Sequence, residues 1–599
     1  MGHDTAMPSS SADSEVVRRY HIASKHHPRR FAPGPGGLDW ANQPDPFRRF
    51  SGADLVPLPL VSGRGFCRYD MLFGGTAPAA RPFDLTALGL LFELGLGLSA
   101  WKEYGSSRWA LRNNPSSGNL HPTEGYLVIV AETEEAPPPG VYHYAPHDHA
   151  LERRCRFAVP VADPLAAAFP GIPAIVGLTS VHWREAWKYG ERAFRYCQHD
   201  VGHAIAALRF AARVLGWDLR VLAGPSDHDV AALLGLDRPA DFEGAEPEHP
   251  DCLLAIDPAG AGQRAPALPA DLSALMANAA WFGLANRLSP RHVTWRTMAT
   301  VETAATRTQR SRRPAPAVAV ARGDAVEPDI PAAAARDAVQ IIRQRRSAVA
   351  MDATTGIGKA AFLGMLSRTM PDLDRPPWDA FPFLPAVLLA LFVHRVAGLA
   401  PGLYLLARDH ALLPRFRAAC TADYLAWQAV DAGGLPLYAL MPDADLRAVA
   451  AHVSCGQDIA GDGAFSLGMI ADFDRTLAAE GAWAYRRLFW ETGIIGQVLY
   501  LEAENAGVRA TGIGCFFDDL MHGLFGFDPA STAWQSLYHF TVGGAVGDDR
   551  LRTAPAYAHL RRGGIGERIG ERIGPQMPAP APRSPSPERG GNSGVSRSR

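Results

Sequence analysis

Two stretches of the chain share one pattern, and this repetition constrains the fold more than any other feature. "GVYHYAPHDHALERR" begins at Gly140 and "GLYLLARDHALLPRF" begins at Gly402. Both give G-[VL]-Y, then an alanine, then D-H-A-L. Matching features in the same order along a chain are the sequence signature of a repeated structural unit. The pattern therefore predicts a tandem duplication.

A second pair of matching segments supports this interpretation. Each runs from glycine to glycine, from Gly202 to Gly216 and from Gly493 to Gly507. Apolar residues recur in both at helical spacing, and the closing glycine stands where a helix C-cap belongs. We expect two α+β units of about 240 residues each, every unit an antiparallel-rich mixed sheet flanked by helices.

Composition shifts give the expected boundaries. Residues 1–45 look loose, 46–290 form the first unit, and 337–563 form the second. Between the units, 291–336 are dominated by Ala, Arg, Pro and Thr, as in a linker, and 564–599 have the low complexity of a disordered tail.

The composition also narrows the partners and the compartment. A net charge of −2 argues against general attraction to nucleic acid or acidic lipid. The seven cysteines form no CxxC pair, as in a protein of the reducing cytosol. The opening residues lack the apolar segment of a signal peptide. The apolar run at 380–393 contains two prolines and is too short for a bilayer, which favours a buried strand. We expect a cytoplasmic protein.

The stretch "RNNPSSGNLHPTEGYLVIV" predicts a polar turn that leads into a strand. Pro115 lacks an N–H, Gly118 and Asn119 tolerate positive φ, and Ser116 and Ser117 offer hydroxyl and backbone donors. The turn is either purely structural or a place where these donors hold a polar ligand.

Three further groups could carry chemistry. In "WKYGERAFRY", Lys188 and Tyr189 are adjacent ionisable groups, and a lysine desolvated near arginines has the lowered pKa of a general base. The alternative is an amphipathic helix whose charges face water. The sequence "RRS" at 345–347 suits a phosphate clamp or a solvated helix end. His199 and His203 are spaced i, i+4, but a hydrogen-bonded core pair is favoured over a ligand pair, so no metal is expected.

Together these motifs resemble the nitroreductase superfamily, and within it the SagB/ThcOx-type dehydrogenases, some of which oxidise azolines to azoles in peptides. "NPSSGNLHP" is similar to the family turn that lies against FMN, and "GVYHYAPHDHAL" to its strand pair. "KYGERAFRY" is similar to the start of its helix, and "RRSA" to its phosphate clamp. The resemblance covers residues from about Leu55 to Leu560 apart from the linker. It implies FMN as the cofactor.

Family enzymes are usually homodimers in which one subunit supplies the clamp and the other the turn. Here the first half has the turn and the K-Y-G motif but "GFCRYDML" at its clamp position. The second half has the clamp but "RPPWDAFPFLP" at its turn position and "GAWAYRRLF" in place of K-Y-G-x-R. The resemblance therefore implies a pseudo-dimer within one chain, with one composite FMN site and one vestigial site. The implied cofactor-binding residues are Pro115, Ser116, Ser117, Gly118, Asn119, Arg345, Arg346, Ser347, Gln497, Gly512, Ile513, Gly514 and Arg550.

One departure concerns an amide. The family often has Gln-Asn where the first half has Ala206 and Ala207, and the glutamine survives only as Gln497 in the second half.

The leading hypothesis is an FMN-dependent dehydrogenase acting on a small molecule or a peptide, with Lys188 or Tyr189 as the base. The resemblance also allows for biosynthetic partner proteins. An NAD(P)H-dependent nitro or quinone reductase is one alternative, and a flavin-free binding or scaffold protein is another.

Overall fold

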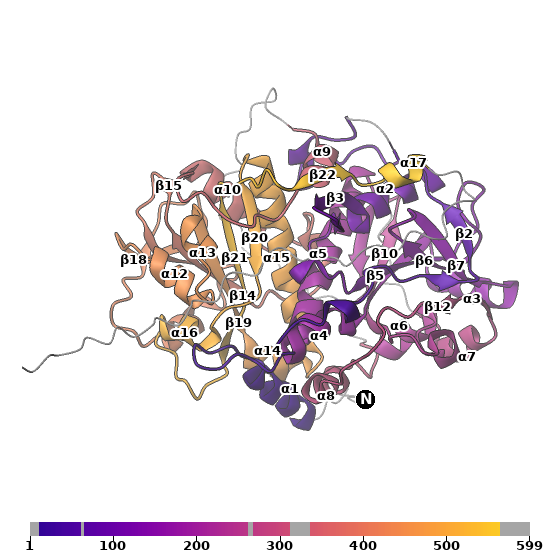
Figure 1. Cartoon of the computed structure of the whole chain (residues 1–599), viewed down its shortest axis with the longest axis horizontal. Helices are drawn as coiled ribbons and strands as arrows, with labels where there is room; N and C mark the ends of the chain where they lie inside the picture. The colour runs from indigo at the N-terminus through magenta and orange to yellow at the C-terminus, as the bar shows by residue number, and fades with distance from the viewer. Residues whose placement is uncertain (1–10, 62–64, 261–267, 312–335, 563–599) are drawn as a thin grey trace, which may run out of the picture.

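The computed structural model describes residues 11–61, 65–260, 268–311 and 336–562 and contains two large antiparallel sheets (Figure 1). The first sheet has the order β11-β7-β6-β5-β8-β10-β9, and the second has the order β17-β18-β16-β14-β19-β21-β20. The first comprises β5 (Thr123–Ile129), β6 (Gly140–Ala145), β7 (Ala150–Arg156), β8 (Ala174–Ser180), β9 (Asp218–Val221), β10 (His249–Asp257) and β11 (Ala280–Trp281), with β2 (Asp54–Pro57) paired to β7. The second comprises β14 (Val387–Val393), β16 (Gly402–Leu406), β17 (Gln428–Ala429), β18 (Leu437–Pro442), β19 (Phe465–Asp472), β20 (Arg509–Ile513) and β21 (Trp534–Gly543).

The two sheets have the same connectivity. In each, the six main strands lie in the order third, second, first, fourth, sixth, fifth along the chain, and all their pairings are antiparallel. The predicted α+β fold of antiparallel-rich sheets and helices is thus confirmed. β14 is buried throughout, as predicted for the apolar run that it ends.

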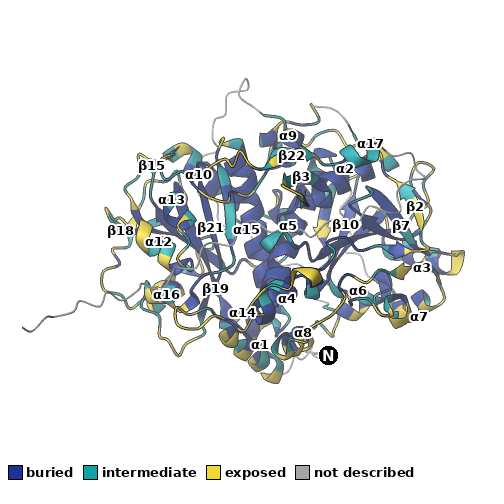
Figure 2. Ribbon diagram, viewed as in Figure 1, coloured by how far each residue is buried: buried dark blue, intermediate teal, exposed yellow. Residues whose placement is uncertain are grey.

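Two long helices lie side by side between the sheets: α5 (Ala193–Val214) and α15 (Ala484–Asn505), each of 22 residues (Figure 1). Almost every residue of both is buried (Figure 2). They cross at two glycines, since a Cβ added at Gly202 would lie 2.2 Å from the Trp490 carbonyl oxygen, and one at Gly493 would lie 2.2 Å from that of His199. Gly216 and Gly507 end the helices with φ of +73° and +77°, as the C-cap pattern predicted.

Reciprocal ion pairs join the two halves. The third residue of α5, Arg195, pairs with Asp518 at the start of α16 (Asp518–Gly523), at 2.8 Å. The third residue of α15, Arg486, pairs with Asp227 at the start of α6 (Asp227–Leu234), at 2.5 Å. All four side chains are buried. Each half therefore gives a helix-borne arginine to the other, as the subunits of a two-fold symmetric dimer do.

A third sheet combines residues from both halves. It has the order β22-β3-β4, with β3 (Leu98–Tyr104) and β4 (Ser107–Arg112) from the first half and β22 (Arg552–Pro555) from the end of the second. Tyr557 follows β22, and its hydroxyl accepts a hydrogen bond from the Leu98 N–H at 2.8 Å. The last described segment is thereby fixed to the opposite half.

The remaining elements cover these sheets. Short strand pairs are β1 (Phe50–Ser51) with β12 (Leu284–Ala285) and β13 (Ile357–Gly358) with β15 (Val396–Ala397). The other helices are α1 (Ser11–Ala23), α2 (Leu85–Leu96), α3 (Val159–Ala168), α4 (His182–Tyr189), α7 (Leu272–Ala277), α8 (Arg296–Ala304), α9 (Ala338–Gln344), α10 (Lys359–Thr369), α11 (Leu413–Ala419), α12 (Arg447–Val453), α13 (Ile459–Asp462), α14 (Phe473–Glu480) and α17 (Ala558–Arg562).

Two segments expected to be loose are built into the fold. Within residues 1–45, α1 buries Val17 and Tyr20, and the Tyr20 hydroxyl donates to the Glu191 carbonyl at 2.6 Å. Within 291–336, α8 buries Met298, whose N–H donates to the Glu191 carboxylate at 2.7 Å. The prediction of a loose tail and linker is wrong for residues 11–45 and 291–311, because a few apolar residues and hydrogen bonds to Glu191 dock each segment. The expected linker residues 312–335 and the tail 564–599 lie outside the described residues.

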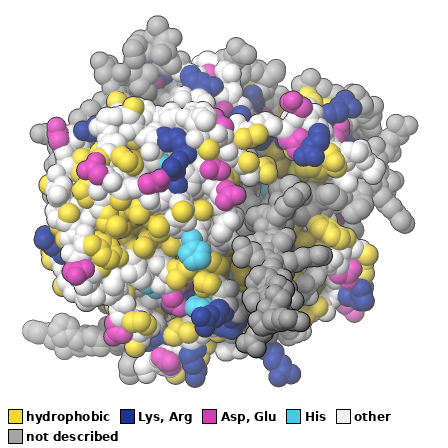
Figure 3. Space-filling view, turned by 60° about the vertical axis from the view of Figure 1, so that its left-hand side comes forward, with side chains coloured by type: hydrophobic (Ala, Val, Ile, Leu, Met, Phe, Trp, Pro, Cys, Tyr) yellow, Lys and Arg dark blue, Asp and Glu magenta, His cyan; other side chains and the backbone are white. Residues whose placement is uncertain are grey.

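The surface in Figure 3 shows basic and acidic side chains scattered among one another, without a large patch of one sign on that face. This distribution agrees with the small net charge. Within the described ranges, no helix has both the length and the apolarity needed to cross a lipid bilayer.

Candidate functional site

The predicted polar turn lies between β4 and β5, and its residues 116–119 are half-buried. Gly118 and Asn119 have φ of +62° and +61°, as their residue types predicted. Pro115 is buried and anchors the turn, while the Ser116 hydroxyl accepts the His121 N–H at 2.8 Å and the Asn119 amide donates to the Ala110 carbonyl at 2.9 Å. Internal hydrogen bonds therefore fix the shape of the turn.

The structure brings Lys188 and Tyr189, at the end of α4, against this turn. A Cβ added at Gly118 would lie 2.5 Å from the Tyr189 hydroxyl and 3.0 Å from Lys188 Nζ, so a side chain there would displace these groups. Burial lowers the pKa of Lys188, and nearby Glu185 opposes this effect. Burial raises the pKa of Tyr189 well above 10, so the phenol stays protonated at neutral pH. Of the two, Lys188 has the direction of shift that suits a general base.

Two buried carboxyl groups lie beneath the turn. Asp200 on α5 accepts the Ser117 N–H at 3.1 Å. Burial raises the pKa of Asp200 to about 7, and hydrogen bonds from Ser116 and Ser117 only partly offset this. Burial, followed by the charge of Asp200, raises the pKa of Glu185 well above its usual value. At least one of the two carboxyl groups holds a proton near neutral pH.

Arg345 and Arg346 reach from the second half to the backbone of the first. Arg345 Nη2 donates to the Arg112 carbonyl at 2.9 Å, directly before the turn, and Arg346 Nη2 donates to the Ser99 carbonyl at 3.0 Å. Burial lowers the pKa of Arg346 to about 10, with the charges of Arg345 and Arg509 adding to the effect. Burial also lowers the pKa of Lys102 on β3, helped by Arg346 and Arg509. Four cationic side chains thus gather beside the turn.

Strand β20 forms the floor next to this cationic group. Ser347 pairs with Ala510, and the Tyr500 hydroxyl lies 2.9 Å from the Ser347 hydroxyl and accepts the Gly512 N–H at 3.0 Å. Further along, the Gly514 carbonyl accepts the Tyr196 hydroxyl at 3.0 Å. Because the Tyr196 ring also packs against Tyr189 with centroids 4.5 Å apart, Gly512–Gly514 lies on the same side as Lys188 and Tyr189.

Two residues of this region that were predicted to bind the cofactor are buried in the protein core. Ile513 is buried in the core of the second half, and Gln497 on α15 is buried close to His203. His203 Nε2 lies 3.3 Å from the Tyr538 hydroxyl, and His199 Nδ1 lies 2.9 Å from the Thr492 hydroxyl. His199 and His203 are therefore a hydrogen-bonded core pair, as predicted.

Arg550 is separated from the other predicted residues. Its side chain is 72% exposed and pairs with Asp548 at 2.8 Å. It also stacks over Tyr104 at the end of β3, with 5.9 Å to the ring centroid. Arg550 thus lies at the rim of the cationic group.

The corresponding place in the other half is filled by large side chains. When the starts of α5 and α15 are aligned, Trp483 takes the position of Arg192, and Trp490 takes that of His199. Glu491 then corresponds to Asp200. Glu491 accepts the Ala386 N–H at 2.9 Å, as Asp200 accepts that of Ser117. Trp483, Trp490 and Phe383 line the small pocket that remains, together with Arg486.

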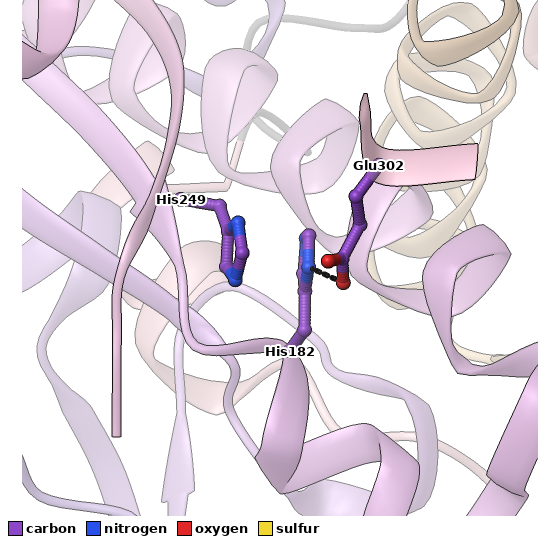
Figure 4. Close-up of side chains that lie close together, drawn as sticks. All are labelled: His182, His249 and Glu302. Carbon is purple, nitrogen blue, oxygen red and sulfur yellow. Dashed lines mark hydrogen bonds and ion pairs between the residues drawn. The ribbon is translucent and has the colours of Figure 1, made fainter. Parts of the chain in front are cut away.

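A separate group of possible metal ligands joins α4, β10 and α8 (Figure 4). His182 Nδ1 lies 2.5 Å from a Glu302 oxygen, and the His182 and His249 rings stack at 4.0 Å with 12° between their planes. Nitrogen lone pairs lie in the ring plane, so stacked parallel rings do not direct two nitrogens at one ion. In this arrangement the group ties α8 to the first half.

Sequence reasoning gave the wrong environment for the arginines after Tyr189. Neither faces water, because Arg192 and Arg195 are buried and form ion pairs with Asp518. The lowered pKa of Lys188 comes from burial rather than from these arginines. It also missed Asp200, Tyr196, Lys102 and Arg509. The helical spacing of Asp200 and Tyr196 after K-Y-G was a usable signal, whereas the strand residues Lys102 and Arg509 gave none.

Residues 103–246, which include the turn, Lys188 and Asp200, match the model of the nitroreductase family. The match covers less than half of the chain, so the likeness to this family holds for that segment. Proteins of this family typically bind a flavin.

Two curated relatives are similar over short regions. The trifolitoxin-processing protein TfxB of Rhizobium leguminosarum bv. trifolii is 30% identical over 138 residues, which are 20% of this chain and 35% of that protein. A protein of Methanocaldococcus jannaschii named as a nitroreductase is 30% identical over 126 residues, 20% of this chain and 62% of that protein. The chain thus spans less than two thirds of either relative.

A solved structure from Anabaena variabilis, also named as a nitroreductase, superimposes with a TM-score of 0.64. The superposition covers 89% of this chain and 99% of that one at 20% identity. This likeness shows that the fold is shared over nearly the whole length.

Proposed function

We propose that the chain is an FMN-dependent oxidoreductase of the SagB/ThcOx type, with one composite site between its two halves. One observation carries the proposal: two arginines of the second half donate hydrogen bonds to the backbone of the first. Arg345 bonds to the Arg112 carbonyl, and Arg346 bonds to the Ser99 carbonyl. This contact sets a cationic clamp beside the turn, so the parts divided between the halves meet in one place.

The residues present fit a flavin mononucleotide. Its phosphate is a dianion, and positive charge is concentrated here: Arg346 and Arg509 add to the burial that lowers the pKa of Lys102, and Arg509 adds to the burial that lowers that of Arg346. Arg345 Nε is a buried donor and Asn114 Oδ1 a buried acceptor, neither with a hydrogen-bond partner within the described structure. Such groups call for a polar ligand.

Two glycines let tyrosine side chains come close to the backbone of the site. Gly118 faces Lys188 and Tyr189, and an added Cβ at Gly512 would lie 1.9 Å from the Tyr538 hydroxyl. The backbone of the turn and of Gly512–Gly514 would line the cofactor, with Ser347 beside its phosphate. Bound FMN supplies two-electron redox chemistry.

Lys188 Nζ is the base that takes the substrate proton. Its half-buried position lowers the pKa of the ammonium and makes the neutral amine accessible. Tyr189 stays protonated and orients the substrate through its hydroxyl. The Glu185–Asp200 pair next to them holds a proton. This pair can give up or take a proton without placing two negative charges in a buried region.

The domain assignment follows from the same features. The identical strand order, the paired helices and the reciprocal Arg195–Asp518 and Arg486–Asp227 ion pairs support a tandem duplication of units 46–290 and 337–563. The tryptophans in the counterpart position support a single working site.

The substrate class proposed is a peptide, with an azoline ring as the oxidised group. The name of TfxB, a toxin-processing protein, supports a peptide and biosynthetic partner proteins. Reduction of nitro or quinone compounds by NAD(P)H is the second candidate, favoured by the name of the Methanocaldococcus relative.

The first test is the absorption spectrum of the purified chain, with released flavin quantified per chain. We expect one FMN. Two FMN per chain would contradict the closed counterpart site, and none after incubation with FMN would favour a flavin-free binding protein.

Variants then separate binding from chemistry. Arg346→Ala should lose FMN, whereas Lys188→Ala should retain it and lose turnover. An Arg346→Ala protein that keeps stoichiometric FMN would refute the composite clamp. Rapid bleaching of the flavin by NADPH would select the reductase over the dehydrogenase.

A further inference from the structure

Two half-buried cysteines, Cys455 and Cys515, lie close to each other beside the composite site. Cys455 follows α12 with φ of +58°, and Cys515 follows β20. The Phe517 N–H donates to the Val453 carbonyl at 2.8 Å, and the Gln457 amide donates to the Cys515 carbonyl at 2.9 Å. These bonds on either side fix the two segments and bring the two thiols close enough for each to shift the pKa of the other.

Cys515 is surrounded by groups that stabilise its thiolate. His26 Nδ1 accepts the Ala32 N–H at 2.9 Å, so the imidazole proton lies on Nε2. The Cys455 thiol, then His26 and the Arg192 guanidinium, lower the pKa of Cys515 to about 5 despite burial.

The other charged group near the pair is Asp518, which helps to keep Cys455 protonated and is itself neutralised by Arg192 and Arg195. Cys455 is therefore a thiol and Cys515 a thiolate at neutral pH. This division is what thiol–disulfide exchange requires, because one sulfur attacks and the other resolves.

The pair is absent from the other half. Cys515 stands three residues before Asp518, and Gly224 stands three residues before the corresponding Asp227. The residue before Cys515, Gly514, accepts the hydrogen bond of Tyr196, which packs on Tyr189. Cys515 thus has no cysteine at the equivalent position of the other half, and it lies next to Gly514 and Tyr196 of the composite site.

We infer that Cys455 and Cys515 are a redox-active pair that reacts with low-molecular-weight or protein disulfides. The Cys515 thiolate attacks one sulfur of the oxidant R–S–S–R, which forms a mixed disulfide and releases RS⁻. Cys455 then gives up its proton and attacks Cys515 Sγ, which forms the intrachain disulfide and expels the second RS⁻. One oxidant disulfide becomes two thiols as two cysteine thiols become one disulfide.

The test uses the full chain, freed of reductant and incubated with oxidised glutathione at a series of glutathione ratios. Remaining thiols are alkylated, and linked peptides are mapped by mass spectrometry. We expect a peptide linked through Cys455 and Cys515. Cys455→Ser should stop at one glutathione adduct on Cys515, and Cys515→Ser should give neither product. The matched control is Cys420→Ser, which removes another half-exposed thiol and should leave the linkage intact.

A second measurement needs no variant. Iodoacetamide should modify Cys515 at pH 6 at least about 100-fold faster than Cys420, whose pKa burial raises to about 12. Equal rates at the two cysteines, together with no linkage and no adduct, would overturn the inference. Because neither readout requires flavin or turnover, the result is independent of the proposed function.

Discussion

The crossing of α5 and α15 gives the sharpest test of how the two halves pack. We predict that Gly202→Ala and Gly493→Ala each destabilise the chain, although alanine favours a helix over glycine by about 1 kcal/mol. A Cβ at Gly202 would lie 2.2 Å from the Trp490 carbonyl oxygen, and a Cβ at Gly493 would lie 2.8 Å from the Cα of Gly202. Both obstacles are backbone atoms, so no side chain can rotate away.

The cost follows from this geometry. An ordinary contact of a Cβ is 3.4–4 Å, so the helices must separate by about 1 Å along their buried interface. Overpacking of this kind costs about 1–3 kcal/mol. After subtraction of the helix-propensity gain of about 1 kcal/mol, we expect a net loss of up to about 2 kcal/mol for each variant. The double variant should lose less than the sum, because one separation relieves both contacts.

The assay is thermal and urea denaturation of the two single variants, the double variant and a control. Gly523→Ala is the control, since Gly523 lies in α16, is exposed and has no atom within 4 Å of an added Cβ. We expect the control to match the wild type or exceed it. If Gly202→Ala and Gly493→Ala unfold at the same temperature as the control, the helices do not cross at these glycines.

Three further predictions concern the site. Burial raises the pKa of Asp200 to about 7, so the folded state keeps a proton that the unfolded state releases above about pH 4. The free energy of unfolding therefore falls as the pH rises from about 4 to about 7, by up to about 4 kcal/mol. Asp200→Asn, which retains an acceptor for Ser117, should flatten the melting temperature between pH 5 and 8; an unchanged slope would refute the shift. Lys102→Ala should weaken FMN binding about 10-fold in a fluorescence titration and reduce its salt dependence, and equal affinity would remove Lys102 from the phosphate group. Arg550→Ala should leave FMN content and melting temperature unchanged, because its guanidinium is exposed and bonded to Asp548; released FMN would show that it binds phosphate.

The sequence carried enough local information to predict the framework. Gly118 and Asn119 take the positive φ that their residue types allow, and Gly216 and Gly507 end their helices. The duplicated strand and helix patterns correspond to two sheets of identical order. Such features depend on residues close in the chain, where backbone freedom and apolar periodicity decide the structure.

Other parts depended on distant partners and left no local trace. Arg195 looks like a surface residue until Asp518 lies beside it, and Lys188 acquires its lowered pKa only through burial. The docking of α8 uses the carboxylate of Glu191, more than a hundred residues away in the chain. Charged residues that are buried in pairs look the same in a sequence as those that face water.

The filled counterpart site has a consequence for how such a protein can change. In a symmetric homodimer one gene segment encodes both catalytic pockets, so a tryptophan that closes one pocket closes the other as well. Here Trp483 and Trp490 occupy positions whose equivalents, Arg192 and His199, are encoded separately. In the proposed pseudo-dimer, selection can therefore act on each pocket independently, and the closed pocket can serve as a rigid support for the other.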